Sequence, residues 1–191
     1  MALRVTGGGL KGRKLAAPRD DAVRPTSSRV RESLFSILGG ASDADVLDLF
    51  AGAGTLGIEA ASRGARRVVF VEENPAHVKL LRRNVALLEG VAESDILRMD
   101  ARRAPARLNR RGERFDLVFL DPPYRRGLAL QTLEALGEGE VLGDEGVVVV
   151  ESATGDPLPA DVGPLRRDDE RRYGSTTLSF YRGAPAPSEP S

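Results

Sequence analysis

The sequence predicts an α/β protein with a doubly wound, mostly parallel sheet. From residue 45 to residue 151, short apolar runs alternate with segments whose apolar residues have helical spacing. This alternation favours parallel strand pairing, right-handed crossovers and helices on both faces of the sheet. Two further β-like runs, joined at Tyr173-Gly174-Ser175, predict an antiparallel hairpin that closes one edge. Together these runs predict a sheet of seven strands.

Each predicted strand is an apolar or alternating run. The expected strands are residues 45–50, 67–72, 95–98, 115–120, 146–151, 165–172 and 176–181. The expected helices between them are residues 54–63, 76–88, 101–108 and 128–137. The run from Val147 to Val150 is apolar throughout, which is typical of a strand buried on both faces.

The segment before the sheet predicts a hairpin and a helix. The hairpin, residues 1–17, would pack its apolar side chains and turn at three glycines: Leu3, Val5, Leu15 and Gly7-Gly8-Gly9. Thr26, Ser27 or Ser28 can cap the helix, and Gly39-Gly40 can end it. Its expected core residues are Val30, Leu34, Phe35, Ile37 and Leu38. By default, Arg29 and Arg31 are expected on solvated faces.

The 191 residues suit a single main core. We expect residues 1–40 to form a basic N-terminal extension, residues 41–183 the main domain, and residues 184–191 a disordered tail rich in Pro and Ser. No apolar run approaches the roughly 18 residues that span a bilayer, and no signal-peptide core is present at the N-terminus. A cytoplasmic protein, monomeric and without a metal ion, is therefore expected.

The composition excludes several chemistries. The chain has no cysteine, so disulfides, thiolate metal sites and cysteine nucleophiles are absent. The one histidine, His77, follows Asn74-Pro75 near an expected helix start and is predicted to be a surface residue. Histidine-based triads and multi-histidine metal sites are therefore excluded.

Charge is unevenly distributed although the net charge is zero. Residues 1–40 contain eight Lys/Arg and three Asp/Glu, and arginine greatly outnumbers lysine in the whole chain. Genomic composition bias accounts for the arginines equally well, but arginine also suits bidentate contacts to phosphate. A basic extension on a neutral protein favours a nucleic-acid partner.

A glycine motif follows the first expected strand. Gly52, Gly54 and Gly57 fit the strand-to-helix fingerprint of dinucleotide-binding Rossmann folds. The first glycine permits a tight turn, the second lets a ligand approach, and the third packs helix against strand. Backbone N–H groups at the helix start favour an anionic or polar ligand.

Two acidic residues follow the next strands. Glu72 comes 20 residues after Gly52 at the end of an apolar run, where a carboxylate can accept hydrogen bonds from both ribose hydroxyls. A cap on the helix that starts near Asn74 is the alternative role for Glu72. Asp100 follows the third strand, where it could bind an adenine amino group or, equally well, cap the next helix.

The segment Asp121-Pro122-Pro123-Tyr124 directly follows the fourth strand. Two prolines cannot continue a central strand, so the chain makes a rigid corner. In a doubly wound sheet this corner would face the Gly52–Gly57 loop across the crevice where ligands bind. The Asp121 carboxylate and the Pro122 carbonyl are acceptors that can hold both N–H bonds of an exocyclic amine, while Tyr124 can stack on the base.

These motifs resemble those of S-adenosylmethionine-dependent methyltransferases that modify exocyclic amines. The whole chain except its last residues resembles one subfamily, the RsmD-type bacterial 16S (small-subunit) rRNA (guanine-N2) methyltransferases. The segments that carry the resemblance are Gly7-Gly8 to Gly12-Arg13-Lys14-Leu15, Arg24-Pro25-Thr26, residues 29–35, Asp48 to Gly54, Asp121 to Gly127, and Tyr173-Gly174-Ser175-Thr176. The resemblance implies the seven-stranded Rossmann-like methyltransferase sheet.

The resemblance also implies roles for individual residues. Those expected to bind S-adenosylmethionine and its product S-adenosylhomocysteine are Asp48, Ala51, Gly52, Gly54, Thr55, Leu56, Glu72, Asp100, Ala101 and Asp121. The corner that presents the guanine amine to the methyl group is Asp121, Pro122, Pro123 and Tyr124. The residues expected to contact 16S rRNA are Arg4, Lys11, Arg13, Lys14, Arg24, Thr26, Arg29, Arg125 and Arg126. The segment that includes Arg24 and Thr26 would also cover the reactive end of the cofactor. Glu73 is a second candidate for the ribose, and the register favours Glu72.

Three alternatives remain at this stage. An adenine-N6 methyltransferase acting on DNA would use the same corner, although the chain has no room for a separate target-recognition domain. A nicotinamide-dependent oxidoreductase would share the glycine fingerprint but leave Asp121 to Tyr124 without a role. A non-catalytic rRNA-binding factor would explain the basic extension but not the crevice.

Overall fold

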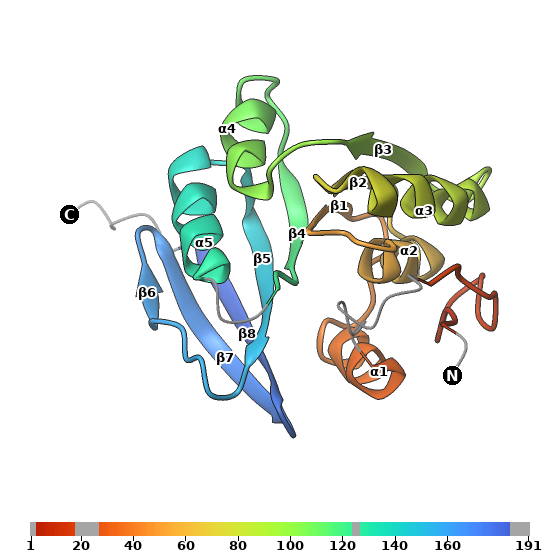
Figure 1. The fold of residues 1–191 in the computed structure, drawn as a ribbon. Helices are drawn as coiled ribbons and strands as arrows, with labels where there is room; N and C mark the ends of the chain where they lie inside the picture. The colour runs from red at the N-terminus through yellow and green to blue at the C-terminus, as the bar shows by residue number, and fades with distance from the viewer. Residues whose placement is uncertain (1–2, 18–26, 124–126, 184–191) are drawn as a thin grey trace.

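The computed structural model describes residues 3–17, 27–123 and 127–183. In these residues eight strands form one sheet in the order β3-β2-β1-β4-β5-β8-β7-β6 (Figure 1). The strands are β1 (Asp45–Leu49), β2 (Arg67–Val71), β3 (Glu93–Leu97), β4 (Phe115–Leu120), β5 (Leu142–Ala153), β6 (Asp161–Val162), β7 (Leu165–Tyr173) and β8 (Thr176–Gly183). β1 to β5 pair in parallel, and β8 lies antiparallel between β5 and β7.

This arrangement confirms the doubly wound, mostly parallel α/β fold with an antiparallel end. The number of strands differs from the predicted seven, because β6 adds a further antiparallel pair to β7. A strand of two residues is too short to show an alternating pattern, so β6 could not be predicted from periodicity.

Helices cover both faces of the sheet (Figure 1). α1 (Ser28–Ile37), α2 (Thr55–Ser62) and α3 (Pro75–Val85) pack on one face; α4 (Ala104–Asn109) and α5 (Leu128–Gly139) pack on the other. Two expected helices are divided, since α3 continues into the 3₁₀ helix η1 (Ala86–Leu88) and α4 is preceded by η2 (Ala101–Arg103).

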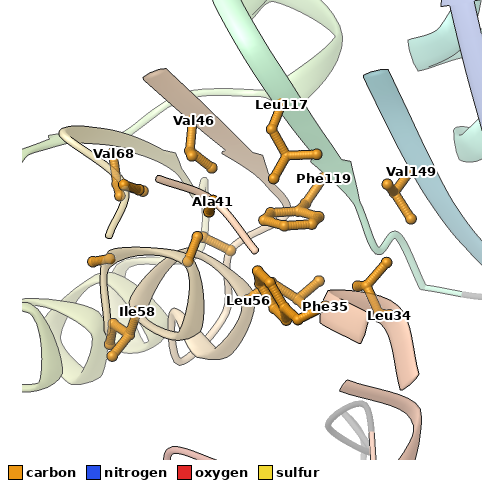
Figure 2. Close-up of a cluster of buried hydrophobic side chains, with 14 of the residues drawn as sticks. Leu34, Phe35, Ala41, Val46, Leu56, Ile58, Val68, Leu117, Phe119 and Val149 are labelled. Atoms are coloured by element: carbon orange, nitrogen blue, oxygen red, sulfur yellow. The ribbon is translucent and has the colours of Figure 1, made fainter. Parts of the chain in front are cut away.

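α1 joins the core through an aromatic contact. Figure 2 shows Leu34 and Phe35 pointing toward Phe119 and Val149 of the sheet. The rings of Phe35 and Phe119 lie 5.7 Å apart at 63°, an edge-to-face arrangement. The prediction for Ile37 was wrong, because this side chain is 41% exposed. At 100° per residue, Ile37 lies about a quarter turn from the buried face of α1.

Arg31 was also predicted wrongly, since it is 1% exposed rather than solvated. It precedes Leu34 and Phe35 by three and four residues, which places it in the middle of the buried face. Its Nη2 donates to the Arg4 carbonyl at 2.7 Å, and its Nε lies 3.8 Å from Glu59. Burial lowers the pKa of Arg31, while Glu59 acts in the opposite direction.

Glu59 of α2 connects the N-terminal hairpin to the sheet domain. Its buried carboxylate accepts hydrogen bonds from the Thr6 N–H at 2.8 Å, the Thr6 hydroxyl at 2.7 Å and the Gly7 N–H at 2.8 Å. Arg63 Nε donates to the same carboxylate at 2.9 Å. One carboxylate therefore holds the hairpin backbone and offsets the charge of Arg31.

The hairpin itself shows a single antiparallel bridge, Arg4 to Lys14, and its Val5 and Leu15 are buried as predicted. Its glycines have a further role that the sequence did not suggest. A Cβ at Gly8 would lie 1.7 Å from the Ser62 carbonyl oxygen, so this glycine is needed for close approach to α2. The hairpin and α1 share one hydrophobic cluster with the sheet, and the division at residue 40 stays a prediction.

We predict that Glu59→Ala lowers the free energy of unfolding by about 3–5 kcal/mol, because it removes the carboxylate that lies 3.8 Å from the buried Arg31 and accepts three hydrogen bonds from the hairpin. Urea unfolding would measure the loss. Glu134→Ala, which removes an exposed glutamate from α5, is the matched control and should change stability by no more than about 0.5 kcal/mol. Equal effects of the two substitutions would contradict the anchoring role of Glu59.

Candidate functional site

The site is built where three parallel strands end at the same level. Leu49 of β1 pairs with Val71 of β2 on one side and with Leu120 of β4 on the other. The glycine loop, Glu72 and Asp121 follow these three residues directly, so all three features meet at one edge of the sheet. β1 is also where the strand order reverses, the position at which ligands bind in open α/β sheets.

The glycine loop turns through left-handed backbone conformations. Phe50, Gly52 and Gly54 have φ values of 60°, 54° and 79°. A Cβ at Gly54 would lie 2.5 Å from Leu81 Cδ1, and one at Gly57 would lie 2.4 Å from Phe70 Cε1. Gly57 thus packs helix against strand as predicted. The space where a Gly54 side chain would lie is occupied by Leu81 of α3. A Cβ at Gly52 would meet only the Phe50 carbonyl oxygen, at an ordinary contact distance of 3.9 Å, so Gly52 is less closely packed than Gly54 and Gly57.

Asp48 lies beneath this loop and is 2% exposed. Its Oδ2 accepts a hydrogen bond from the Gly57 N–H at 2.9 Å, so it satisfies a free donor at the start of α2. Burial raises the pKa of Asp48 to about 7; the hydrogen bond from Gly57 lowers the pKa and the nearby charge of Glu72 adds to the rise. A cation placed nearby would favour the ionised carboxylate.

Glu72 is tied to the glycine loop. Its Oε2 accepts from the Gly52 N–H at 2.9 Å, and its Oε1 accepts from the Asn74 N–H at 2.8 Å. The spacing of 20 residues therefore corresponds to a direct contact, and the alternative of a role at the start of α3 is also realised. Glu73 is exposed, which supports Glu72 as the acid in the crevice. His77 is half-buried rather than on the surface, with Nδ1 3.7 Å from Glu72 Oε1.

Asp100 caps the helix η2 in this structure. Its Oδ1 accepts from the Arg102 N–H at 2.9 Å, and its Oδ2 forms an ion pair with Arg102 Nη2 at 2.6 Å. The side-chain hydrogen bond from Arg102 holds the pKa of Asp100 below its usual value. Arg102 also donates to Gln131 of α5 at 2.9 Å. Ala101 beside it is buried.

The proline corner borders a pocket. Asp121 is half-buried, Pro122 is buried and Pro123 is exposed. A pocket of about 110 Å³ lies between the two prolines, the start of α5 and the end of β5. Its described lining is both apolar and polar and includes Leu128 and Ser152, but it contains neither Asp121 nor a residue of the glycine loop. Tyr124, Arg125 and Arg126 lie outside the described residues.

Asn84 is a residue that the sequence analysis missed. Its Oδ1 accepts from the Ala16 N–H at 2.8 Å, while its Nδ2 donates to the carbonyls of Ala16 at 2.9 Å and Ala53 at 2.8 Å. It thus joins the end of the hairpin to the glycine loop. The available signal was its place on the buried face of α3, after Val78 and Leu81, where a polar side chain needs partners.

The predicted RNA-binding cations that the structure describes are exposed: Arg4, Lys11, Arg13, Lys14 and Arg29. Arg24 and Thr26 lie outside the described residues. The hairpin backbone is held by Glu59 and Ser62 of α2 and by Asn84 of α3. Among the described residues, Ala16 is connected to the glycine loop through Asn84.

The other predicted cofactor residues line or support the loop. Ala51, Thr55 and Leu56 are buried, and the Ala51 N–H donates to the Val71 carbonyl at 3.0 Å. The open side of Gly52, the Glu72 carboxylate and the buried Asp48 fit a ligand with a ribose and a positive charge.

Within the described ranges, no group of His, Asp and Glu side chains is arranged to hold a metal ion. The helices of those ranges are also too short or too polar to cross a membrane.

Comparison with known proteins identifies the family. The model of the family described as conserved hypothetical protein 95 matches residues 3–182. Ribosomal RNA small subunit methyltransferase D of Escherichia coli (strain K12) is 39% identical over 181 residues, 94% of this chain and 89% of that protein. YlbH of Bacillus subtilis (strain 168) is 36% identical over 181 residues, 94% of this chain and 98% of that protein. A solved structure of Escherichia coli yhhF superposes with a TM-score of 0.83 at 35% identity, covering 97% of this chain and 100% of that one. The chain therefore belongs to the family described as conserved hypothetical protein 95, and with it to the RsmD-type methyltransferases that its motifs resemble.

Proposed function

We propose that this protein methylates the exocyclic N2 amine of a guanine in 16S rRNA. Its family membership makes it an S-adenosylmethionine-dependent rRNA methyltransferase. The observation that supports the specific reaction is that β1 and β4 end side by side, with Leu49 paired to Leu120. The glycine loop follows β1 and the Asp121–Pro123 corner follows β4, so the two segments start next to each other. One side of the crevice suits a ribose-bearing methyl donor, and the other suits an amine acceptor.

The residues of the loop would hold the donor. When bound, S-adenosylmethionine supplies a methyl group on a positively charged sulfur. Glu72 would accept hydrogen bonds from its ribose, and Asp48 with the backbone around Gly52 would hold its methionine part. Asp100 and Ala101 would contact the adenine. For Asp100 this role requires that its carboxylate share or release the contact with Arg102.

The corner would orient the amine. The Asp121 carboxylate and the Pro122 carbonyl accept its two N–H bonds and leave the nitrogen lone pair directed toward the methyl group. A guanine amine is a poor nucleophile because its lone pair is delocalised into the ring, and close in-line placement lowers the barrier to transfer. Tyr124 would stack on the base, which must leave its helix or loop to enter the pocket.

The hairpin would bind RNA. Its exposed lysine and arginine side chains suit the phosphate backbone, and the family's relatives include proteins named for the small ribosomal subunit. We propose that the substrate lies in an assembling or assembled subunit, that the enzyme acts as a monomer, and that the segment with Arg24 and Thr26 covers the reactive end of the cofactor.

A tritiated-methyl assay tests the proposed reaction. The acceptors are deproteinised 16S rRNA, small ribosomal subunits and double-stranded DNA, followed by nucleoside mass spectrometry of the product. We expect label in RNA, recovered as N2-methylguanosine. Label recovered as N6-methyladenine in DNA would instead support the alternative methyltransferase, and label in none of the three acceptors would overturn the proposal.

We predict that Asp121→Ala lowers kcat by at least about 100-fold, because the amine loses a charged acceptor placed for the transition state. Binding of S-adenosylhomocysteine, measured by calorimetry, should be nearly unchanged. Asp121→Asn keeps a hydrogen-bond acceptor, but its amide cannot take up the proton that the guanine amine loses on methylation. Substantial activity in this variant would assign Asp121 to orientation alone, and full activity of Asp121→Ala would contradict its role.

We predict that S-adenosylmethionine binding at pH 6 releases close to one proton. Asp48 has a pKa of about 7 in the free protein, so it is mostly protonated at pH 6, and a nearby cation favours the carboxylate. Calorimetry in buffers of different ionisation enthalpy measures this release, which should disappear above pH 8 and in Asp48→Asn.

Two comparisons isolate the cause of this release. The exposed control Asp144→Asn should behave like the unmodified protein. S-adenosylhomocysteine keeps the α-ammonium group of the methionine part that Asp48 would hold, so it should release nearly as many protons as S-adenosylmethionine. Equal proton release by Asp48→Asn and the unmodified protein would show that another group titrates.

A further inference from the structure

The outward face of α3 carries three cations. Lys79, Arg82 and Arg83 are exposed, and their spacing of three and four residues places them on one side of the helix. The opposite side is buried, through residues that include Leu81 and Asn84. No acidic residue occurs between Pro75 and Val85, so the face has a single sign of charge.

These three cations form no ion pair with any residue that the structure describes. The arginines of β7 behave differently, since each has a carboxylate partner within 3.2 Å: Arg166, Arg167, Arg171 and Arg172. The exposed Glu89, which follows α3 in sequence, forms no ion pair with the described cations of that helix. No carboxylate among the described residues therefore neutralises the charge of the α3 face.

The α3 face continues into the hairpin. The Asn84 side chain, next in sequence to Arg83, holds both the N–H and the carbonyl of Ala16. Leu15 of the hairpin and Leu81 of α3 belong to the same buried cluster. Figure 1 shows the red N-terminal segment beside α2 and α3. The hairpin cations and the α3 cations are thus fixed to one another by packed structure rather than by a loose linker.

We propose that the outward face of α3, with Lys79, Arg82 and Arg83, binds the phosphate backbone of the RNA substrate and extends the basic hairpin into one docking surface. The proposal rests on the proposed function and adds a second element to RNA binding. Fixed arginines favour phosphate contacts because their N–H groups form bidentate hydrogen bonds. α3 begins beside Glu72 and ends near the Ala16 contact of the hairpin, so its outward face runs from the hairpin toward the strand end that carries Glu72.

The test uses a matched pair of double variants. Arg82→Gln/Arg83→Gln removes two cations from the last turn of α3, and Arg107→Gln/Arg110→Gln removes two exposed cations from the end of α4, on the other face of the sheet. Both pairs make similar favourable interactions with a helix C-terminus, so thermal unfolding should change equally. Filter binding of deproteinised 16S rRNA and of small subunits is measured over a range of salt concentrations.

We expect the α3 variant to bind RNA about tenfold more weakly near 0.1 M salt, with the slope of log affinity against log salt reduced by about 1.5. Its KM for RNA should rise while kcat and S-adenosylmethionine affinity stay constant. Lys79→Gln, which leaves the helix end intact, should show a smaller loss of the same kind. The α4 variant should bind as the unmodified protein does.

Two results separate failure of this inference from failure of the proposed function. If the unmodified protein methylates RNA and both double variants bind RNA equally well, the α3 surface is not a docking site. If the unmodified protein transfers no methyl group to RNA, the proposed function fails first. Equal weakening by the α3 and α4 variants would indicate a general charge effect and overturn the inference.

Discussion

The site depends on the pairing of β1 with β2 on one side and with β4 on the other. Leu47 and Leu49 are fully buried against the helices of one face, which directs Asp48 to the opposite face, where α2 begins. A shift by one residue would exchange these faces and place the carboxylate among apolar side chains. The same register aligns the ends of the three strands, so the packing of two leucines determines where the acids of the crevice lie.

The crevice gathers negative charge that the surrounding structure only partly compensates. Asp48 and Glu72 each accept backbone N–H groups from the glycine loop or the start of α2, and such donors favour carboxylates. Burial has the opposite effect and dominates for Asp48, whose pKa it raises to about 7. A positive charge on a ligand would favour the ionised form of Asp48 and so offset the effect of burial. For this reason a cationic methyl donor would fit the site better than a neutral nucleotide.

Most residues of the candidate site could be predicted from local sequence patterns. The side chains that hold the surrounding segments in place could not be predicted in this way. The positions of Gly52, Glu72 and Asp121 follow from strand ends and from a spacing of 20 residues, both of which are visible in the sequence. Glu59 bonds to Thr6, 53 residues away, and no local pattern specifies such a partner. Arg31 could have been assigned to the buried face from its spacing to Leu34, but an arginine is rarely buried without a partner, and that partner lies on another helix. The packing of Leu81 against the Cβ position of Gly54 could not be predicted, because no local pattern specifies a contact between residues so far apart in the sequence.

Two side chains that the sequence did not reveal connect the basic hairpin to the glycine loop. Glu59 fixes the hairpin on α2, and Asn84 joins Ala16, near the end of the hairpin, to the Ala53 carbonyl within the glycine loop. A flexible arm would bring RNA near the protein but leave the target base free to sample many positions. If the hairpin binds RNA as proposed, its part-buried hydrogen bonds to α2 and α3 would give each phosphate contact a defined place relative to Gly52 and Glu72. Methyl transfer requires the acceptor within a few tenths of an ångström of its productive position, so a rigid connection is the arrangement that placement of a single base demands.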